Sequence, residues 1–239
     1  MSDLTLIHGF TQTGASWAPV VDRLRSDPSR RFLCPDAPGH GNARPSSGTL
    51  WDVAADIAGQ IFSGVLIGYS MGGRIALHVA LAHPSKVTGL VLVSTTPGIE
   101  SVDERRNRRD ADEVLAQRIG EVGVEAFVDE WLKGPLFNTY RPTEGDLVER
   151  RRNTVEGLSS SLRHQGTGTQ DNLWPRLAEI RMPVLIIAGS VDTKFAEIAQ
   201  RMHRAINHSS LVIVEGAGHA VHLEQPDRVA EAVDTFLNG

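Results

Sequence analysis

The chain has 239 residues, which suits one α/β domain with an inserted subdomain, and its 41% hydrophobic content with 23 glycines is typical of a globular enzyme. A net charge of −5 argues against nucleic acid as a partner, and no apolar segment reaches the length of a membrane span. The single cysteine, Cys34, excludes an intrachain disulfide and a thiolate metal site. Because no secretory leader is evident, we expect a cytoplasmic protein.

The first part of the chain alternates predicted strands with predicted helices. Apolar runs at 4–7, 31–34, 65–68 and 87–93 predict buried strands. Helical spacing of apolar residues occupies 17–24, 50–61 and 75–83, and Pro84 is a stop signal for the last of these. Strands that are apolar on both faces and alternate with helices indicate a parallel sheet covered on both sides. We therefore predict an α/β fold.

The pattern changes after Pro97. Residues 100–152 contain no strand-like run, and their arginines alternate with acidic residues on helical segments. Strand patterns return at 183–189 and 211–214, with a helix at 195–206 between them and a closing helix at the C-terminal end. We interpret residues 98–180 as a helical cap inserted before the last two strands, and residues 1–97 and 181–239 as the core.

The sequence Gly68-Tyr69-Ser70-Met71-Gly72 joins a predicted strand directly to a predicted helix. Gly-x-Ser-x-Gly in this position is typical of a nucleophile elbow, in which a strained turn presents a serine at the end of a strand. The glycines remove Cβ atoms that would clash as strand and helix approach each other. Helix N-terminal amides next to the serine would stabilise negative charge. The alternative is a glycine-rich turn with an exposed serine.

Two further candidates follow later strands. Asp192 comes just after the strand at 183–189, where ligand-facing residues of parallel sheets collect, although an aspartate there can also be a helix N-cap. His219 follows the next strand in a glycine-rich loop, and its alternative is a surface histidine. The order Ser70, Asp192, His219, each just beyond a separate strand, is the order that a catalytic triad requires on such a sheet.

The first strand ends in His8-Gly9-Phe10. We predict that the backbone amides of Phe10 and Met71 converge as an oxyanion hole, and that His8 is structural. We interpret His222 as a local hydrogen-bonding partner rather than a catalyst. No pair of histidines or acids has the spacing of metal ligands, so we expect no metal and no cofactor.

These motifs, together with Pro38-Gly39-His40-Gly41, make the chain similar to the α/β-hydrolase fold from residue 4 to the C-terminus. They indicate the fold and leave the substrate open. A narrower set resembles the SHCHC synthases, where SHCHC is 2-succinyl-6-hydroxy-2,4-cyclohexadiene-1-carboxylate, an intermediate of menaquinone biosynthesis. The motifs in this set are 68–74, 97–99 with the arginine-rich helix after it, Trp131 with 135–137, 166–168 and 192–195.

The resemblance implies a lyase that eliminates pyruvate from SEPHCHC, the 5-enolpyruvoyl precursor of SHCHC. Ser70, activated by His219 and Asp192, would act as a base on the acidic proton of the substrate. The amides of Phe10 and Met71 would stabilise the developing enolate oxygen. No acyl-enzyme is needed in this reaction.

The resemblance also implies residues that bind the carboxylates of this substrate, because arginine binds carboxylates bidentately. The implied pocket residues are Arg74, Arg108 and Arg151 as carboxylate clamps, with Trp131 and Tyr69 as lining. Arg152 is the alternative to Arg151, which the Arg-x-Asn pattern ending at Asn153 favours. For most cap arginines the alternative is a solvated helix face balanced by acids, whereas Arg74 lies one helical turn after Ser70.

Two other functions are open. A hydrolase, such as an esterase, a lactonase or a carbon–carbon bond hydrolase, would use the same Ser70, and residues 220–226 are generic to many such enzymes. A non-catalytic ligand-binding protein is disfavoured, because binding alone does not require three filled catalytic positions. In either enzyme the expected partner is a small molecule, a polycarboxylate for the lyase, and the protein is a monomer or a homodimer.

Overall fold

The computed structural model describes residues 2–239 and is built on one six-stranded sheet. The strands are β1 (Ser2–Ile7), β2 (Arg30–Leu33), β3 (Gly64–Tyr69), β4 (Val87–Val93), β5 (Val184–Gly189) and β6 (Ser209–Val214). Their spatial order is β2-β1-β3-β4-β5-β6, and all five pairs of neighbours are parallel. The predicted parallel sheet is therefore confirmed.

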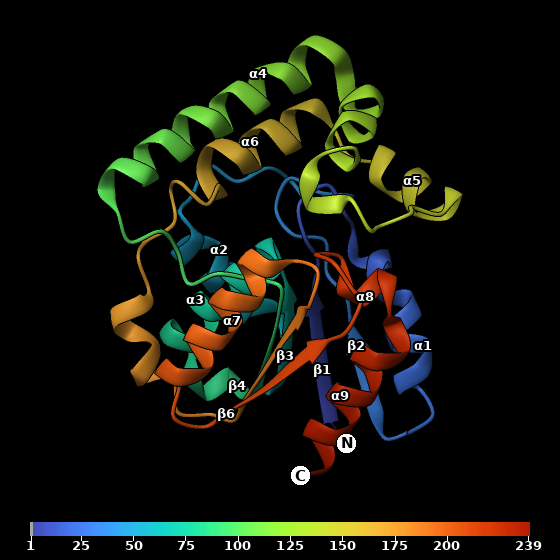
Figure 1. The fold of residues 1–239 in the computed structure, drawn as a ribbon, viewed down its shortest axis with the longest axis vertical. Helices are drawn as coiled ribbons and strands as arrows, with labels where there is room; N and C mark the ends of the chain where they lie inside the picture. The colour runs from blue at the N-terminus through green and yellow to red at the C-terminus, as the bar shows by residue number, and fades with distance from the viewer. Residues whose placement is uncertain (1) are drawn as a thin grey trace.

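Helices cover both faces of this sheet (Figure 1). One face packs against α2 (Leu50–Gln60), α3 (Met71–Ala82) and α7 (Thr193–Ala205), and the other against α1 (Ala18–Leu24), α8 (Val221–Glu224) and α9 (Pro226–Asn238). Short 3-10 turns occupy Gly14–Trp17, Pro84–Lys86, Pro135–Phe137 and Trp174–Glu179. Within residues 2–239 we find no helix that is both long and apolar enough to traverse a bilayer.

The central strands are mostly apolar because both of their faces are largely buried. On β4, Leu90 and Leu92 belong to the cluster under α3, whereas Val91 and Val93 belong to the cluster under α9. Successive side chains of a strand point to opposite faces, so a strand covered on both sides needs an apolar residue at every position. The edge strands differ, since Leu33 of β2 is exposed and β6 is only partly buried.

Between β4 and β5 the chain forms three helices, α4 (Val102–Leu132), α5 (Glu144–Arg151) and α6 (Val155–Gln165). α4 bends at Gly123, which has a φ of 78°. Figure 1 shows α4 and α6 side by side across one end of the sheet, and they pack together around Ile119 and Leu158. Leu177 and Ile180, near the end of the predicted cap, pack with the core instead. The division of the chain at residues 97 and 181 stays a prediction.

Four buried histidines make the stability of this fold sensitive to acid. Burial lowers the pKa of His8 and of His78 to about 4 and that of His40 to about 3, and it holds the pKa of His222 well below its usual range. Because each folded-state pKa is depressed, the unfolded chain binds more protons in mild acid. The stabilisation is present above the unfolded-state value of 6.5 and is lost as the pH falls from there toward the folded-state values.

We expect the free energy of unfolding to decrease by about 1.3 kcal/mol per histidine, so by about 5 kcal/mol in all, between pH 7.5 and pH 5.5. Urea unfolding at the two pH values measures this decrease. A His78→Leu variant lacks one of the four groups, and its decrease should be smaller by about 1.3 kcal/mol. Equal stability of the unsubstituted protein at both pH values would contradict the prediction.

Candidate active site

Ser70 alone makes the turn between β3, which ends at Tyr69, and α3, which begins at Met71. Its φ of 50° and ψ of −108° lie outside the regions that non-glycine residues favour, a strain of about 1–3 kcal/mol. The neighbouring chain holds this conformation. The Ser70 amide donates to the carbonyl of Val93 at 2.9 Å, and the Ser70 carbonyl accepts from the hydroxyl of Thr95 at 2.7 Å.

The two elbow glycines are required by close backbone approach. A Cβ added to Gly68 would lie 2.4 Å from the carbonyl oxygen of Gly72, where β3 passes into α3. A Cβ added to Gly72 would lie 2.1 Å from the carbonyl oxygen of Ile7, at the end of β1. Real Cβ contacts are never this short, so the expectation that these glycines permit the elbow is confirmed.

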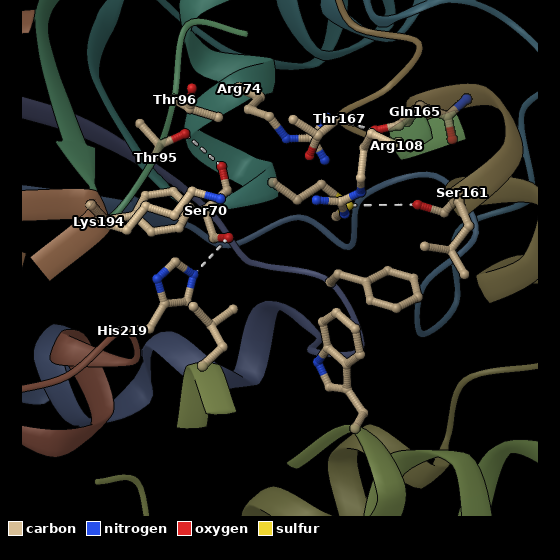
Figure 2. A pocket seen from close by; sticks show the side chains of 17 residues that line it. Ser70, Arg74, Thr95, Thr96, Arg108, Ser161, Gln165, Thr167, Lys194 and His219 are labelled. Atoms are coloured by element: carbon tan, nitrogen blue, oxygen red, sulfur yellow. Dashed lines mark hydrogen bonds between the residues drawn. The ribbon is translucent and has the colours of Figure 1, made fainter. Parts of the chain in front are cut away.

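The three predicted catalytic side chains form a continuous chain of hydrogen bonds. Ser70 Oγ lies 3.1 Å from Nε2 of His219 (Figure 2). Nδ1 of the same ring lies 2.6 Å from Oδ2 of Asp192. The other carboxylate oxygen of Asp192 accepts the Phe195 amide at 3.3 Å and so caps α7. Asp192 therefore caps α7 and also lies where the predicted triad requires its acid; its catalytic role stays a prediction. In this arrangement the imidazole can accept the serine proton while the carboxylate fixes its orientation.

A cavity of about 170 Å³ opens beside Ser70, between the core and the cap helices (Figure 2). Its lining contains three cationic side chains, Arg74, Arg108 and Lys194, and no aspartate or glutamate among the described residues. Figure 2 shows Arg74 and Arg108 together on one side of Ser70 and Lys194 on the other. A lining with this excess of positive charge favours an anionic ligand that spans Ser70.

The two arginines are held differently. Arg74 is buried, and its Nη1 donates to the carbonyl of Gln165 on α6 at 2.7 Å. Burial and the nearby Arg108 lower the pKa of Arg74 to about 10, so Arg74 is a cation at neutral pH. Arg108 is partly exposed, and its Nε lies 2.8 Å from the buried carboxylate of Asp112. A carboxylate ligand would supply Arg74 with an anionic partner that the cavity lining does not.

The proposed oxyanion-hole residues, Phe10 and Met71, both line the cavity next to Ser70. Within residues 2–239, neither of their backbone amides has a hydrogen-bond acceptor, and the Met71 amide is at the N-terminus of α3. Free amides at a helix start favour negative charge. Their convergence on one oxygen stays a prediction.

The structure does not bring Arg151 to the cavity. Its Nη2 lies 3.2 Å from Asp129 on α4, and its Nη1 is within 4 Å of Glu125 and Glu144. These three carboxylates of the cap satisfy its charge locally. The expectation of a third carboxylate clamp at this position is therefore corrected, and the third cation of the cavity is Lys194.

Tyr69 and His222 also differ from expectation. Tyr69 lies behind His219, with ring centroids 5.4 Å apart, and does not line the cavity. His222 is not a local partner, because its Nε2 pairs with the amide of Gln12, 210 residues earlier, at 3.3 Å. Its ring packs 4.1 Å from Tyr69 and 4.7 Å from Trp17, which makes it part of the support beneath His219. By contrast, Trp131 lines the cavity as expected.

Several lining residues were not predicted to line a pocket, although five of them lie in the motifs 135–137, 166–168 and 192–195 that carry the resemblance. They are Thr95, Thr96, Leu136, Ser161, Leu162, Gln165, Gly166, Thr167, Lys194 and Phe195. Lys194 and Phe195 directly follow Asp192, so their adjacency to a triad candidate was a usable signal. Ser161 and Gln165 are four apart on α6 and share a face, but nothing in the sequence shows that this face points into the site.

The alpha/beta hydrolase family model matches residues 6–232. With the fold and the Ser70–His219–Asp192 arrangement described above, the chain belongs to the alpha/beta hydrolase family.

Within this family its similarity to one group of enzymes extends over nearly the whole chain. It is 40% identical to the Bacillus subtilis (strain 168) protein assigned as a 2-succinyl-6-hydroxy-2,4-cyclohexadiene-1-carboxylate synthase, over 97% of this chain and 88% of that one. It is 29% identical to the synthase of that name from Photorhabdus laumondii, over 98% and 85%. The solved structure of MenH from S. aureus superposes with a TM-score of 0.93 at 31% identity, covering 99% of this chain and 93% of that one.

Proposed function

We propose that this protein is an SHCHC synthase, a lyase of menaquinone biosynthesis that eliminates pyruvate from SEPHCHC. The observation that carries the proposal is the cavity beside Ser70, lined by three cations and by no carboxylate among the described residues. The carboxylates of a polycarboxylate substrate can pair with these three cations, whereas a neutral ester has no carboxylate that could pair with them. The similarity to synthases of this name over nearly the full chain supports the same conclusion.

In the proposed mechanism, His219 accepts the hydroxyl proton of Ser70 through Nε2, and Asp192 stabilises the resulting imidazolium. The Ser70 oxygen takes the acidic C–H proton of the substrate. The electron pair of that bond becomes an enolate, whose oxygen the amides of Phe10 and Met71 stabilise. The carbonyl then reforms and a new ring double bond forms as the C–O bond to the enolpyruvoyl group breaks, so the enolate of pyruvate leaves with that bonding pair. The proton held by His219 passes to this enolate, which gives pyruvate and restores the neutral imidazole.

The cations orient the substrate for this step. Arg74 and Arg108 bind carboxylate on one side of Ser70, and Lys194 binds carboxylate on the other. Trp131 and Phe10, whose rings lie 5.4 Å apart, form an apolar wall for the ring of the substrate. Because α4 and α6 contribute lining residues, we propose that residues 98–180 act as a cap that completes the pocket.

The test is pyruvate release from freshly generated SEPHCHC, measured beside hydrolysis of a short p-nitrophenyl ester. Rapid pyruvate release with weak ester cleavage is the expected result. Efficient ester cleavage without pyruvate would instead identify a hydrolase that uses the same Ser70.

We further propose that the protein works in the cytoplasm on a small polycarboxylate, without metal, cofactor or nucleic acid, as a monomer or a homodimer.

A further inference from the structure

The residue after Phe10 has a backbone conformation that its side chain disfavours. Thr11 has a φ of 65°, in the left-handed region that β-branched residues avoid, and it is fully buried. Such a conformation persists only where surrounding contacts determine it. Since Thr11 directly follows Phe10, the contacts that fix Thr11 also constrain the chain that presents the Phe10 amide to the cavity.

Two hydrogen bonds hold Thr11, one from Arg150 at the C-terminal end of α5 and one from Asn153 just after this helix. Nη1 of Arg150 donates to the Thr11 hydroxyl at 2.5 Å, and Nδ2 of Asn153 donates to the Thr11 carbonyl at 2.7 Å. The Asn153 amide is itself fixed on both sides. Its Nδ2 also donates to the Arg150 carbonyl at 2.8 Å, and its Oδ1 accepts the Gly41 amide at 2.8 Å. The contact therefore binds both the side chain and the backbone of Thr11.

The contact between Arg150 and Thr11 is buried, and its donor is a charged guanidinium. Arg150 is 1% exposed, and its Nε lies 2.6 Å from the largely buried carboxylate of Asp146. A buried guanidinium is unfavourable unless it is paired and hydrogen-bonded, so its position on Thr11 is specific. One residue before Arg150, Glu149 accepts the hydroxyl of Thr13 at 3.1 Å. The end of α5 thus meets the Phe10 loop at two successive points.

We propose that Arg150 and Asn153 are positioning residues, which hold Thr11 in its left-handed conformation and thereby fix the Phe10 amide where negative charge develops on the substrate. The proposal rests on the proposed function, because it concerns the oxyanion hole of the same site. It gives the cap a second role beside its contribution to the cavity lining. It also assigns Arg150 and Asn153 of this arginine-rich segment to loop positioning and not to carboxylate binding.

The test is Asn153→Asp, which keeps the size of the side chain and the acceptor for Gly41 but removes the donor to the carbonyls of Thr11 and Arg150. We expect kcat for pyruvate release to fall about 10- to 100-fold, somewhat less than loss of a whole oxyanion-hole donor. KM should change by less than about threefold, because Arg74, Arg108 and Lys194 are untouched. Asn138→Asp is the matched control, since it makes the same chemical change at an exposed cap position away from the loop.

A second substitution separates loop positioning from general destabilisation. Glycine adopts a φ near 65° without strain, so adding Thr11→Gly to Asn153→Asp should restore kcat at least fivefold. Because glycine also relieves strain and removes the hydroxyl that accepts from Arg150, thermal unfolding is measured for both variants. A gain in kcat without a matching gain in melting temperature indicates loop positioning, whereas a gain that follows the melting temperature indicates only restored stability. The inference is overturned if Asn153→Asp retains kcat within twofold of Asn138→Asp, or if the double variant is no faster than the single one.

Failure of this inference can be told apart from failure of the proposed function. If the unsubstituted protein releases no pyruvate, the proposed function is wrong. If it releases pyruvate and Asn153→Asp does so equally fast, only the positioning role is wrong.

Discussion

Ser70→Ala is expected to lower kcat for pyruvate release from SEPHCHC about 10³- to 10⁴-fold. General-base catalysis by a positioned group contributes about 10²- to 10⁴-fold, and Ser70 is the only link between His219 and the substrate in the proposed mechanism. His219 is 1% exposed and lies 3.1 Å from the serine oxygen. In Ser70→Ala the oxygen that takes the substrate proton is therefore missing, and no other group of residues 2–239 occupies its place. Coupled reduction of the released pyruvate by lactate dehydrogenase measures the rate.

Binding provides the control for this variant. The three cations that line the cavity are unchanged in Ser70→Ala, so SHCHC, the product, should bind within about threefold of its affinity for the unsubstituted protein. Titration calorimetry measures this affinity. Pyruvate release within tenfold of the unsubstituted rate would remove Ser70 from the mechanism.

Arg74→Met is expected to lower kcat/KM for SEPHCHC about 10²- to 10³-fold. The variant keeps an unbranched chain of similar length but loses the charge, and hydrogen bonds to charged groups contribute about 1.5–3 kcal/mol each. A bidentate clamp makes two such bonds, or about 3–4 kcal/mol after partial compensation, which corresponds to the stated factor. Progress curves over a range of SEPHCHC concentrations give kcat/KM.

A neutral substrate and a surface arginine serve as controls. Hydrolysis of p-nitrophenyl acetate should change by less than about threefold in Arg74→Met, because that ester has no carboxylate to bind. Arg106→Met removes the same charge from α4 at an exposed position that pairs with Asp103, and it should leave both activities unchanged. An equal loss on the charged and the neutral substrate would show that Arg74 supports the structure of the site and does not bind carboxylate.

The elbow and the triad were predictable because each depends on short stretches of sequence. A single serine between an apolar strand and a helix requires a sharp turn, and the flanking Gly68 and Gly72 indicate where this turn lies. The carboxyl ends of parallel strands meet at one edge of the sheet, so residues just after β5 and β6 must approach the residue just after β3. Distance along the chain therefore did not hide the approach of Asp192 and His219 to Ser70.

The cap was harder to interpret, since arginines and acidic residues are dense in α4 and α5. Consecutive residues of a helix point about 100° apart, so three arginines in a row face three different environments. Arg150 is buried on Thr11, Arg151 faces the acids of α4, and Arg152 pairs at the surface with Glu149. No local pattern selects which of these directions leads to the cavity, because packing of the cap against the core determines it.

The sequence by itself determined the parallel sheet, the elbow at Ser70, the order of the triad and the position of Arg74 one turn after the serine. These features follow from periodicity, glycine placement and strand ends, which act over a few residues. Only the tertiary structure decided that Lys194 replaces Arg151 at the cavity and that Arg150 and Asn153 hold Thr11. The contacts of Thr11 join residues 139 and 142 positions apart, a separation that carries no periodic signal, and the packing of these segments against each other brings them together.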